Sequence, residues 1–285
     1  MSIILGSKFA CKNWYPTDPD ELVSVITKHY TTSTDNVRAV IAPHAGYRYC
    51  GETFSRGMSR VNSNQTYDKV FIIGPSHYQS VRNTAYVCDT FKWIATALDL
   101  CEIDTQTSAL LGTKDHFELD SEILYPEHSI QLHIPFIQHT LPDVPVVPII
   151  IGEMDQHVEQ SIADTIKSVS TENSLFMISS DFTHHGEKFN YTPFVDQPDI
   201  KQQIRDFDKN VIDLIVSNDY HAYREYINSN NNTICGRHAI SLLLNIIAGE
   251  NLTVQEQDYS MSGDLTGDYS NNVSYASITF TRNDQ

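Results

Sequence analysis

Four short segments of the chain are almost entirely apolar, which is typical of strands that are buried on both faces of a sheet. We predict these strands at Val37–Ile41, Lys69–Ile73, Val144–Ile151 and Ser174–Ile178. A fifth segment, Val273–Phe280, alternates between apolar and hydroxyl-bearing residues, and this alternation predicts a strand at the edge of a sheet.

Helical periodicity separates the predicted strands. Asp18-Pro19 combines a capping residue with a proline of the first turn, so a helix should begin there. Apolar residues three and four apart predict further helices at Met154–Val169, Ile200–Val216 and Ala239–Ala248. The segment Tyr259–Asn272, rich in glycine, serine and aspartate, predicts a loop. Strands that alternate with helices favour an αβα sandwich with a central, mostly parallel, mixed sheet, and we expect residues 1–285 to form one α/β domain.

Charge and cysteine usage narrow the class of protein. The formal net charge is −17, and the 19 basic residues are scattered, which argues against a nucleic-acid or anionic-membrane surface. No apolar stretch approaches the roughly 20 residues of a membrane-spanning helix. The N-terminus lacks the basic region of a signal peptide, and the 5 cysteines form no CxxC pair. We therefore expect reduced thiols and a cytoplasmic protein.

Polar side chains follow the predicted strands at the points where they end. His44 follows the first strand, His77 follows the second, and Asp181 and His184 follow the fourth. The carboxyl ends of parallel strands share one edge of a sheet, where functional groups collect. Cys235 precedes a buried helix, whose dipole should lower the pKa of the thiol. Two imidazoles and a thiolate suit copper or zinc and are acceptable to iron, although residue types alone leave a structural role equally open.

Other residues have simpler interpretations. His128 and His133 lack the i,i+4 spacing of a zinc-binding helix, so we expect hydrogen-bonded framework residues. Arg237 should bond to backbone carbonyls or to a carboxylate rather than to a substrate phosphate. Neither a GxGxxG nor a GxxxxGK[ST] motif occurs, which argues against a dinucleotide-binding site and a P-loop nucleotide site. A GxSxG motif is missing too, so a serine hydrolase of the type that carries this motif is not expected.

Five motifs, in order along the chain, resemble those of the Memo family of cell-motility mediators: Ala42-Pro43-His44-Ala45-Gly46-Tyr47, Gly74-Pro75-Ser76-His77, Glu127-His128-Ser129-Ile130, Ser179-Ser180-Asp181-Phe182 and Thr233-Ile234-Cys235-Gly236-Arg237-His238. The family is similar in fold to class III extradiol dioxygenases, which bind non-haem Fe(II) through two histidines and a glutamate. The resemblance implies that His44, His77 and Cys235 bind copper or iron. Because Cys235 stands where a carboxylate is expected, we do not expect ring cleavage.

The resemblance also implies a biological setting. It implies copper-dependent redox activity, signalling in cell motility or invasive growth, and a location in the cytoplasm and nucleus. It further implies binding of phosphotyrosine peptides in the same cleft, lined by Trp14, Tyr49, Asp181 and His184.

Three hypotheses follow. The first is a copper- or iron-binding redox protein in which Asp181 and His184 orient groups around the metal. The second is a non-catalytic module that captures a phosphotyrosine peptide of a signalling protein. The third is a cysteine hydrolase with Cys235 as nucleophile, a histidine as base and Asp181 as orienting group. The sequence leaves the native metal, any substrate, the partner and the oligomeric state open.

Overall fold

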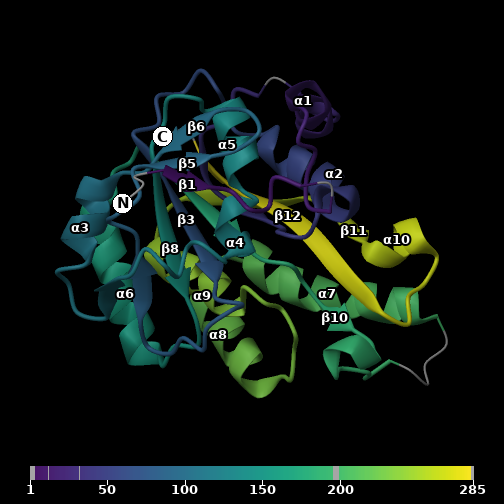
Figure 1. The fold of residues 1–285 in the computed structure, drawn as a ribbon. Helices are drawn as coiled ribbons and strands as arrows, with labels where there is room; N and C mark the ends of the chain where they lie inside the picture. Colours follow the sequence, from purple (N-terminus) through teal and green to yellow (C-terminus); the bar gives the residue numbers. More distant parts are fainter. Residues whose placement is uncertain (1–3, 12, 32, 195–198, 284–285) are drawn as a thin grey trace.

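A mixed sheet forms the centre of the computed structural model, which describes residues 4–11, 13–31, 33–194 and 199–283 (Figure 1). The strands lie in the order β10-β12-β2-β9-β3-β8-β4-β7, and β11 pairs with β12. The inner strands β2, β9, β3 and β8 run parallel, whereas β12 is antiparallel to β2, and β4 is antiparallel to β8. The strand bounds are β2 Val37–Ala42, β3 Lys69–Pro75, β4 Ala85–Val87, β7 Phe117–Leu119, β8 Val146–Ile151, β9 Ser174–Ser179, β10 His184–His185, β11 Leu252–Met261 and β12 Asn272–Arg282.

Helices cover both faces of this sheet, which explains why the inner strands are apolar throughout. In β3, Phe71 and Ile73 pack against one helical layer, and Val70 and Ile72 pack against the other. The first layer contains α6 Gln156–Val169, α7 Ile200–Val216, α8 Tyr220–Ser229 and α9 Arg237–Ile246. The second contains α1 Pro19–Thr27, α2 Tyr47–Met58, α4 His128–Gln131 and α5 Ile134–Thr140. Figure 1 shows the two layers above and below the sheet.

Smaller elements complete the fold. A second sheet joins β1 Ile4–Gly6, β5 Trp93–Ala95 and β6 Leu100–Glu102. The remaining short elements are α3 Thr105–Leu111, the 3₁₀ turn Glu187–Phe189 and α10 Ser262–Thr266. Within the described residues, no helix is both long and apolar enough to span a membrane.

Most elements predicted from the sequence are confirmed. The four apolar strands occur within one or two residues of their predicted bounds. At the start of α1, the Asp18 carboxylate accepts a hydrogen bond from the backbone N–H of Glu21 at 2.9 Å, as expected of a capping residue.

Two predictions near the C-terminus are wrong. The segment Tyr259–Asn272 is not simply a loop, because β11 extends to Met261 and α10 follows it. The final strand is not at an edge, because β12 lies between β2 on one side and β11 and β10 on the other. The hydroxyl residues that suggested a solvent face, such as Ser274, are buried, and the Ser274 hydroxyl donates to the carboxylate of Asp208. Pairing with strands that are distant in the sequence therefore buries β12 in spite of its polar residues.

Candidate metal centre

His44, His77 and Cys235 meet at the edge of the sheet where β2 and β3 end. Their nearest ring nitrogens and the thiol sulfur all lie within 4.8 Å of one another. The Cys235 sulfur is 3.2 Å from Nε2 of His44, and the His44 and His77 ring centroids are 4.9 Å apart. The sequence therefore placed the two histidines correctly, and the tertiary structure adds the thiol from the segment that precedes α9.

Glycines allow the close approaches that build this edge. A Cβ atom at Gly236 would lie 2.5 Å from the carbonyl oxygen of Ser179, so only glycine lets the start of α9 contact the end of β9. A Cβ atom at Gly46 would lie 2.7 Å from the carbonyl oxygen of Asn13. The backbone N–H of Tyr47 bonds to the carbonyl of Trp14 at 2.7 Å, which ties the N-terminal segment to the site.

The hydrogen bonds of His44 determine which of its nitrogens carries the proton. The hydroxyl of Ser179 donates its single proton to the carbonyl of Ser129. It must therefore accept from Nδ1 of His44, which lies 2.7 Å away. Burial and the neighbouring histidines hold the pKa of His44 well below its usual value. His44 is thus neutral, with its Nε2 lone pair directed at Cys235.

A buried carboxylate fixes His77 in the same tautomer. Nδ1 of His77 is 2.9 Å from Oε1 of Glu127, and the backbone N–H of His77 donates to Oε2 at 2.7 Å. Although burial disfavours the charge, the bonds from His77 outweigh it and hold the pKa of Glu127 below its usual value. An ionised carboxylate only accepts, so Nδ1 carries the proton and Nε2 is free to bind a metal.

His128 belongs to this cluster, contrary to the framework role predicted for it. Its ring centroid lies 4.3 Å from that of His77 and 5.2 Å from that of His44. Together with His77 and Glu127 it forms a second group of possible metal ligands. Burial and the proximity of His77 lower the pKa of His128 to about 4. The spacing argument failed because it sought a second histidine on the same helix, whereas the histidines beside His128 follow the ends of strands.

The carboxylate of Asp181 bonds to the backbone of His44 rather than to an imidazole ring. Its carboxylate accepts from the backbone N–H of His44 at 2.8 Å, and its own backbone N–H donates to the Cys235 sulfur at 3.1 Å. Burial raises the pKa of Asp181. His184 lies nearby, and its Nδ1 is 2.9 Å from the carbonyl oxygen of Phe182. Since a carbonyl only accepts, Nδ1 of His184 carries the proton.

The protonation state predicted for Cys235 is wrong for the metal-free site. Burial strongly raises the pKa of its thiol, and the charge of Asp181 adds to this effect. The start of α9 does not compensate for the loss of solvent. Cys235 is therefore a neutral thiol in the metal-free site, and a cation beside it would favour the loss of its proton.

The two aromatic residues expected in the cleft are separated. The Trp14 ring packs against His128 at 5.0 Å between centroids, so it adjoins the imidazole cluster. Tyr49 is 39% exposed and lines a different cavity, between α2 and the β11–α10 segment.

Comparison with known proteins identifies the family. The family model described as Memo-like protein matches residues 9–279. The chain belongs to the Memo family. Protein MEMO1 of Xenopus tropicalis is 32% identical over 279 residues, covering 93% of both chains. The memo-1 homolog of Caenorhabditis elegans is 30% identical over 93% of this chain and 79% of its own, and MEMO1 family protein MHO1 of Saccharomyces cerevisiae is 28% identical over 93% and 95%.

A solved structure supports the fold alone. The crystal structure of the uncharacterized protein JW3007 from Escherichia coli K12 matches with a TM-score of 0.50 and 11% identity. The match covers 86% of this Memo family chain and 99% of the other chain.

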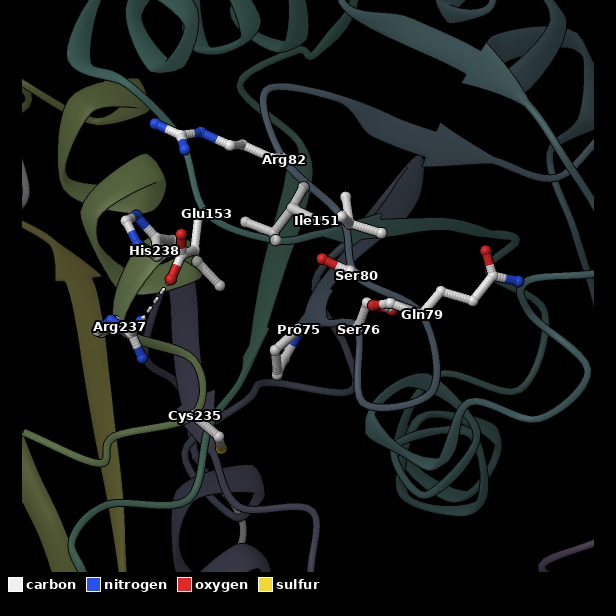
Figure 2. Close-up of a pocket in the computed structure, with 13 residues that line it drawn as sticks. Pro75, Ser76, Gln79, Ser80, Arg82, Ile151, Glu153, Cys235, Arg237 and His238 are labelled. Atoms are coloured by element: carbon white, nitrogen blue, oxygen red, sulfur yellow. Dashed lines mark hydrogen bonds and ion pairs between the residues drawn. The ribbon is translucent and has the colours of Figure 1, made fainter. Parts of the chain in front are cut away.

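A cavity of about 400 Å³ adjoins Cys235 on the side of the chain that carries Arg237 (Figure 2). In Figure 2 the sulfur of Cys235 points away from Arg237, and neither His44 nor His77 is among the residues that line the cavity. The expected role of Arg237 is confirmed, because its guanidinium donates to the carbonyl of Ile234 at 3.5 Å and to Glu153 at 3.4 Å.

Proposed function

We propose that this Memo family protein binds one copper or iron ion through His44, His77 and Cys235 and acts as a redox protein. One observation carries the proposal: both histidines are held by buried partners with Nδ1 protonated, which leaves the Nε2 lone pairs beside the thiol. Metal-binding histidines typically donate their second ring N–H to a carboxylate or another oxygen in this way. This arrangement of lone pairs supports the proposal of a metal centre.

The donor set favours copper or iron over harder cations. The thiolate is a soft ligand and imidazole nitrogens suit copper and iron, whereas magnesium and calcium prefer oxygen. A bound copper or iron ion would supply one-electron chemistry. His44 and His77 would bind as neutral donors, and Cys235 would release its proton when it binds. The partly exposed ring of His77, with 27% of its side chain accessible, offers the route from solvent.

Ring cleavage is not part of this proposal. The iron sites of extradiol dioxygenases use two histidines and a carboxylate. Here a thiol completes the group of three, and the carboxylate of Glu127 is engaged with both the ring and the backbone of His77. A role in signalling for cell motility or invasive growth, in cytoplasm and nucleus, rests on family membership.

Metal analysis tests the proposal. Protein purified under reducing conditions should bind one copper or iron ion per chain, and Cu(II) should give a thiolate-to-copper absorption band. Cys235→Ser and His77→Ala should each weaken binding at least tenfold and abolish the band or shift it. His157→Ala, on the exposed side of α6, is the matched control. Unchanged stoichiometry and affinity in the Cys235→Ser/His77→Ala double variant would disprove the site.

A second candidate function, a cysteine hydrolase, is favoured by the 3.2 Å distance between the Cys235 sulfur and Nε2 of His44. This distance suits a nucleophile and its base. The orienting group would be Ser179, which bonds to Nδ1 of His44, instead of Asp181. Reaction of metal-free protein with a thioester or p-nitrophenyl ester tests it: a covalent adduct on Cys235 that disappears in His44→Ala would support a hydrolase, and an unlabelled Cys235 would exclude it.

A further inference from the structure

The cavity beside Cys235 is lined by donor groups that the metal proposal does not use. Arg237 and His238 line one wall at the start of α9, and Ser76 and Ser80 line the opposite wall beyond the end of β3 (Figure 2). Arg82 lies at the end of the cavity remote from Cys235 in Figure 2. The cavity lining therefore contains two arginines and the carboxylate of Glu153, in a chain whose net charge is −17.

A buried network fixes the tautomer of His238. The guanidinium of Arg224 donates to the carboxylate of Glu159 at 2.6 Å, to the carbonyl of Met154, and to Nδ1 of His238 at 3.2 Å. An arginine only donates, so Nδ1 of His238 must accept and the ring proton must be on Nε2. The ring lines the cavity, and within the described part of the chain no acceptor is recorded for Nε2.

Burial of the two charged groups of this network costs free energy, which indicates a role beyond stability. Arg224 is 6% exposed and Glu159 is fully buried. Buried ion pairs seldom stabilise a protein more than apolar residues of the same size, because both ions lose their hydration. Here the pair orients His238, a residue of the cavity lining, with its ring proton on Nε2.

Arg237 is held loosely enough to bind a ligand. Its bonds to Glu153 and to the carbonyl of Ile234, at 3.4 and 3.5 Å, are long for charge-assisted hydrogen bonds. The side chain of Glu153 is 66% exposed, so it can move away into solvent. Glu153 therefore holds the guanidinium when no better acceptor is present.

We propose that this cavity binds the carboxylate or phosphate group of a small organic anion, with Arg237 and the Nε2–H of His238 as the recognition groups and Glu153 displaced. A volume of about 400 Å³ suits a ligand of the size of a small aromatic acid. The site does not require a metal ion, because neither His44 nor His77 lines the cavity.

Calorimetric titration of metal-free protein tests the proposal with three probes of one shape: benzoate, phenyl phosphate and the neutral benzamide. At least one of the two anions should bind tenfold or more tightly than benzamide, since hydrogen bonds to charged groups are the stronger ones. The anion that meets this criterion distinguishes a carboxylate from a phosphate ligand. Equal affinity for all three probes, or no binding, would overturn the proposal.

Two substitutions locate the binding site, because we expect them to change the affinity for the anion in opposite directions. Arg237→Gln should weaken the anion about tenfold, whereas Glu153→Gln should tighten it, because it removes the competing carboxylate. Arg60→Gln, whose side chain pairs with Asp35 and does not line the cavity, is the control and should change affinity less than threefold. Unaltered affinity in Arg237→Gln, or weaker binding in Glu153→Gln, would contradict the assignment.

Two substitutions test whether His238 donates to the anion, because one keeps an N–H donor and the other removes it. His238→Gln keeps an N–H donor near the position of Nε2 and should retain most of the affinity, while His238→Phe should lose about tenfold. Equal affinity in the two variants would remove His238 from the site. His77→Ala should bind the anion as the unaltered protein does, so this test stands whether or not the metal proposal holds.

Discussion

The two sides of Cys235 use histidine in opposite ways. On one side, His44 and His77 present bare Nε2 atoms, because oxygen acceptors hold the protons on Nδ1. On the other side, His238 presents Nε2–H, because the arginine on Nδ1 can only donate. One type of side chain thus faces the metal centre as a lone-pair donor and faces the cavity as a hydrogen-bond donor. The group bonded to Nδ1 decides whether a cation or an anion is favoured.

The groups that hold His44 and His238 also differ in charge, and therefore in the free energy that their burial requires. Ser179 holds His44 through neutral groups alone, and its proton goes to a backbone carbonyl. His238 depends on a full ion pair between Arg224 and Glu159 inside the protein. Losing one member of an ion pair leaves an uncompensated charge, so the cavity side should be the more fragile of the two.

The largest effect is therefore expected from Arg224→Met. This change leaves Glu159 buried without its partner and should lower the free energy of unfolding by about 3–5 kcal/mol, as measured by urea denaturation. The double variant Arg224→Met/Glu159→Met removes both charges and should recover most of that loss. Metal affinity should stay within about threefold in the double variant, because its ligands lie across Cys235. A double variant no more stable than the single one would contradict this account of the network.

A smaller effect is expected on the metal side from Glu127→Gln. The glutamine oxygen can still accept from Nδ1 of His77, but the negative charge is lost. Loss of such a supporting carboxylate typically costs 10–100-fold in metal affinity, or about 1.4–2.7 kcal/mol. Competition with a chromophoric chelator measures it, and Glu122→Gln, at an exposed glutamate, is the control. Equal affinity in both variants would show that Glu127 does not support the metal ligand.

A histidine that neither network holds completes the comparison. His133 is fully buried against Phe54, and burial lowers its pKa to about 3. Among the described residues, no hydrogen-bond partner is recorded for either of its ring nitrogens. The unfolded chain, with a histidine pKa near 6.5, binds the extra proton first, so stability falls as the pH drops from about 6.5 toward 3. Between pH 7 and pH 5 this should cost about 2 kcal/mol.

His133→Leu should remove that part of the pH dependence and leave the protein equally stable or more stable at pH 7. Urea denaturation at pH 7 and pH 5 measures both quantities. Phe136→Leu is the control, because Phe136 stacks on the same Phe54 ring at 3.9 Å and carries no titrating group. It should lower stability equally at both pH values. The other buried histidines, such as His44 and His128, should keep the remaining pH dependence. A difference in stability between pH 7 and pH 5 that is as large in His133→Leu as in the unaltered protein would show that His133 does not contribute.

Much of this site could be predicted because its residues sit at the ends of easily recognised strands. Apolar runs located the strands, and the histidines that follow two of them reached the same edge. The role of Glu127 could not be predicted in this way. It lies outside the strands and reaches His77 from 50 positions along the chain. His128 was missed for the same reason, since its partners are brought to it by the packing of α4 against β3.

The sequence by itself determined the family, the fold class and the positions of His44, His77 and Asp181, because these follow from hydrophobic periodicity and local motifs. Only the tertiary structure decided how those groups behave. The sulfur of Cys235 meets Nε2 of His44 across 191 positions of sequence, and burial there raises the thiol pKa that the helix dipole was expected to lower. Tautomers and protonation states depend on burial and on distant hydrogen-bond partners, and both exist only once the chain has folded.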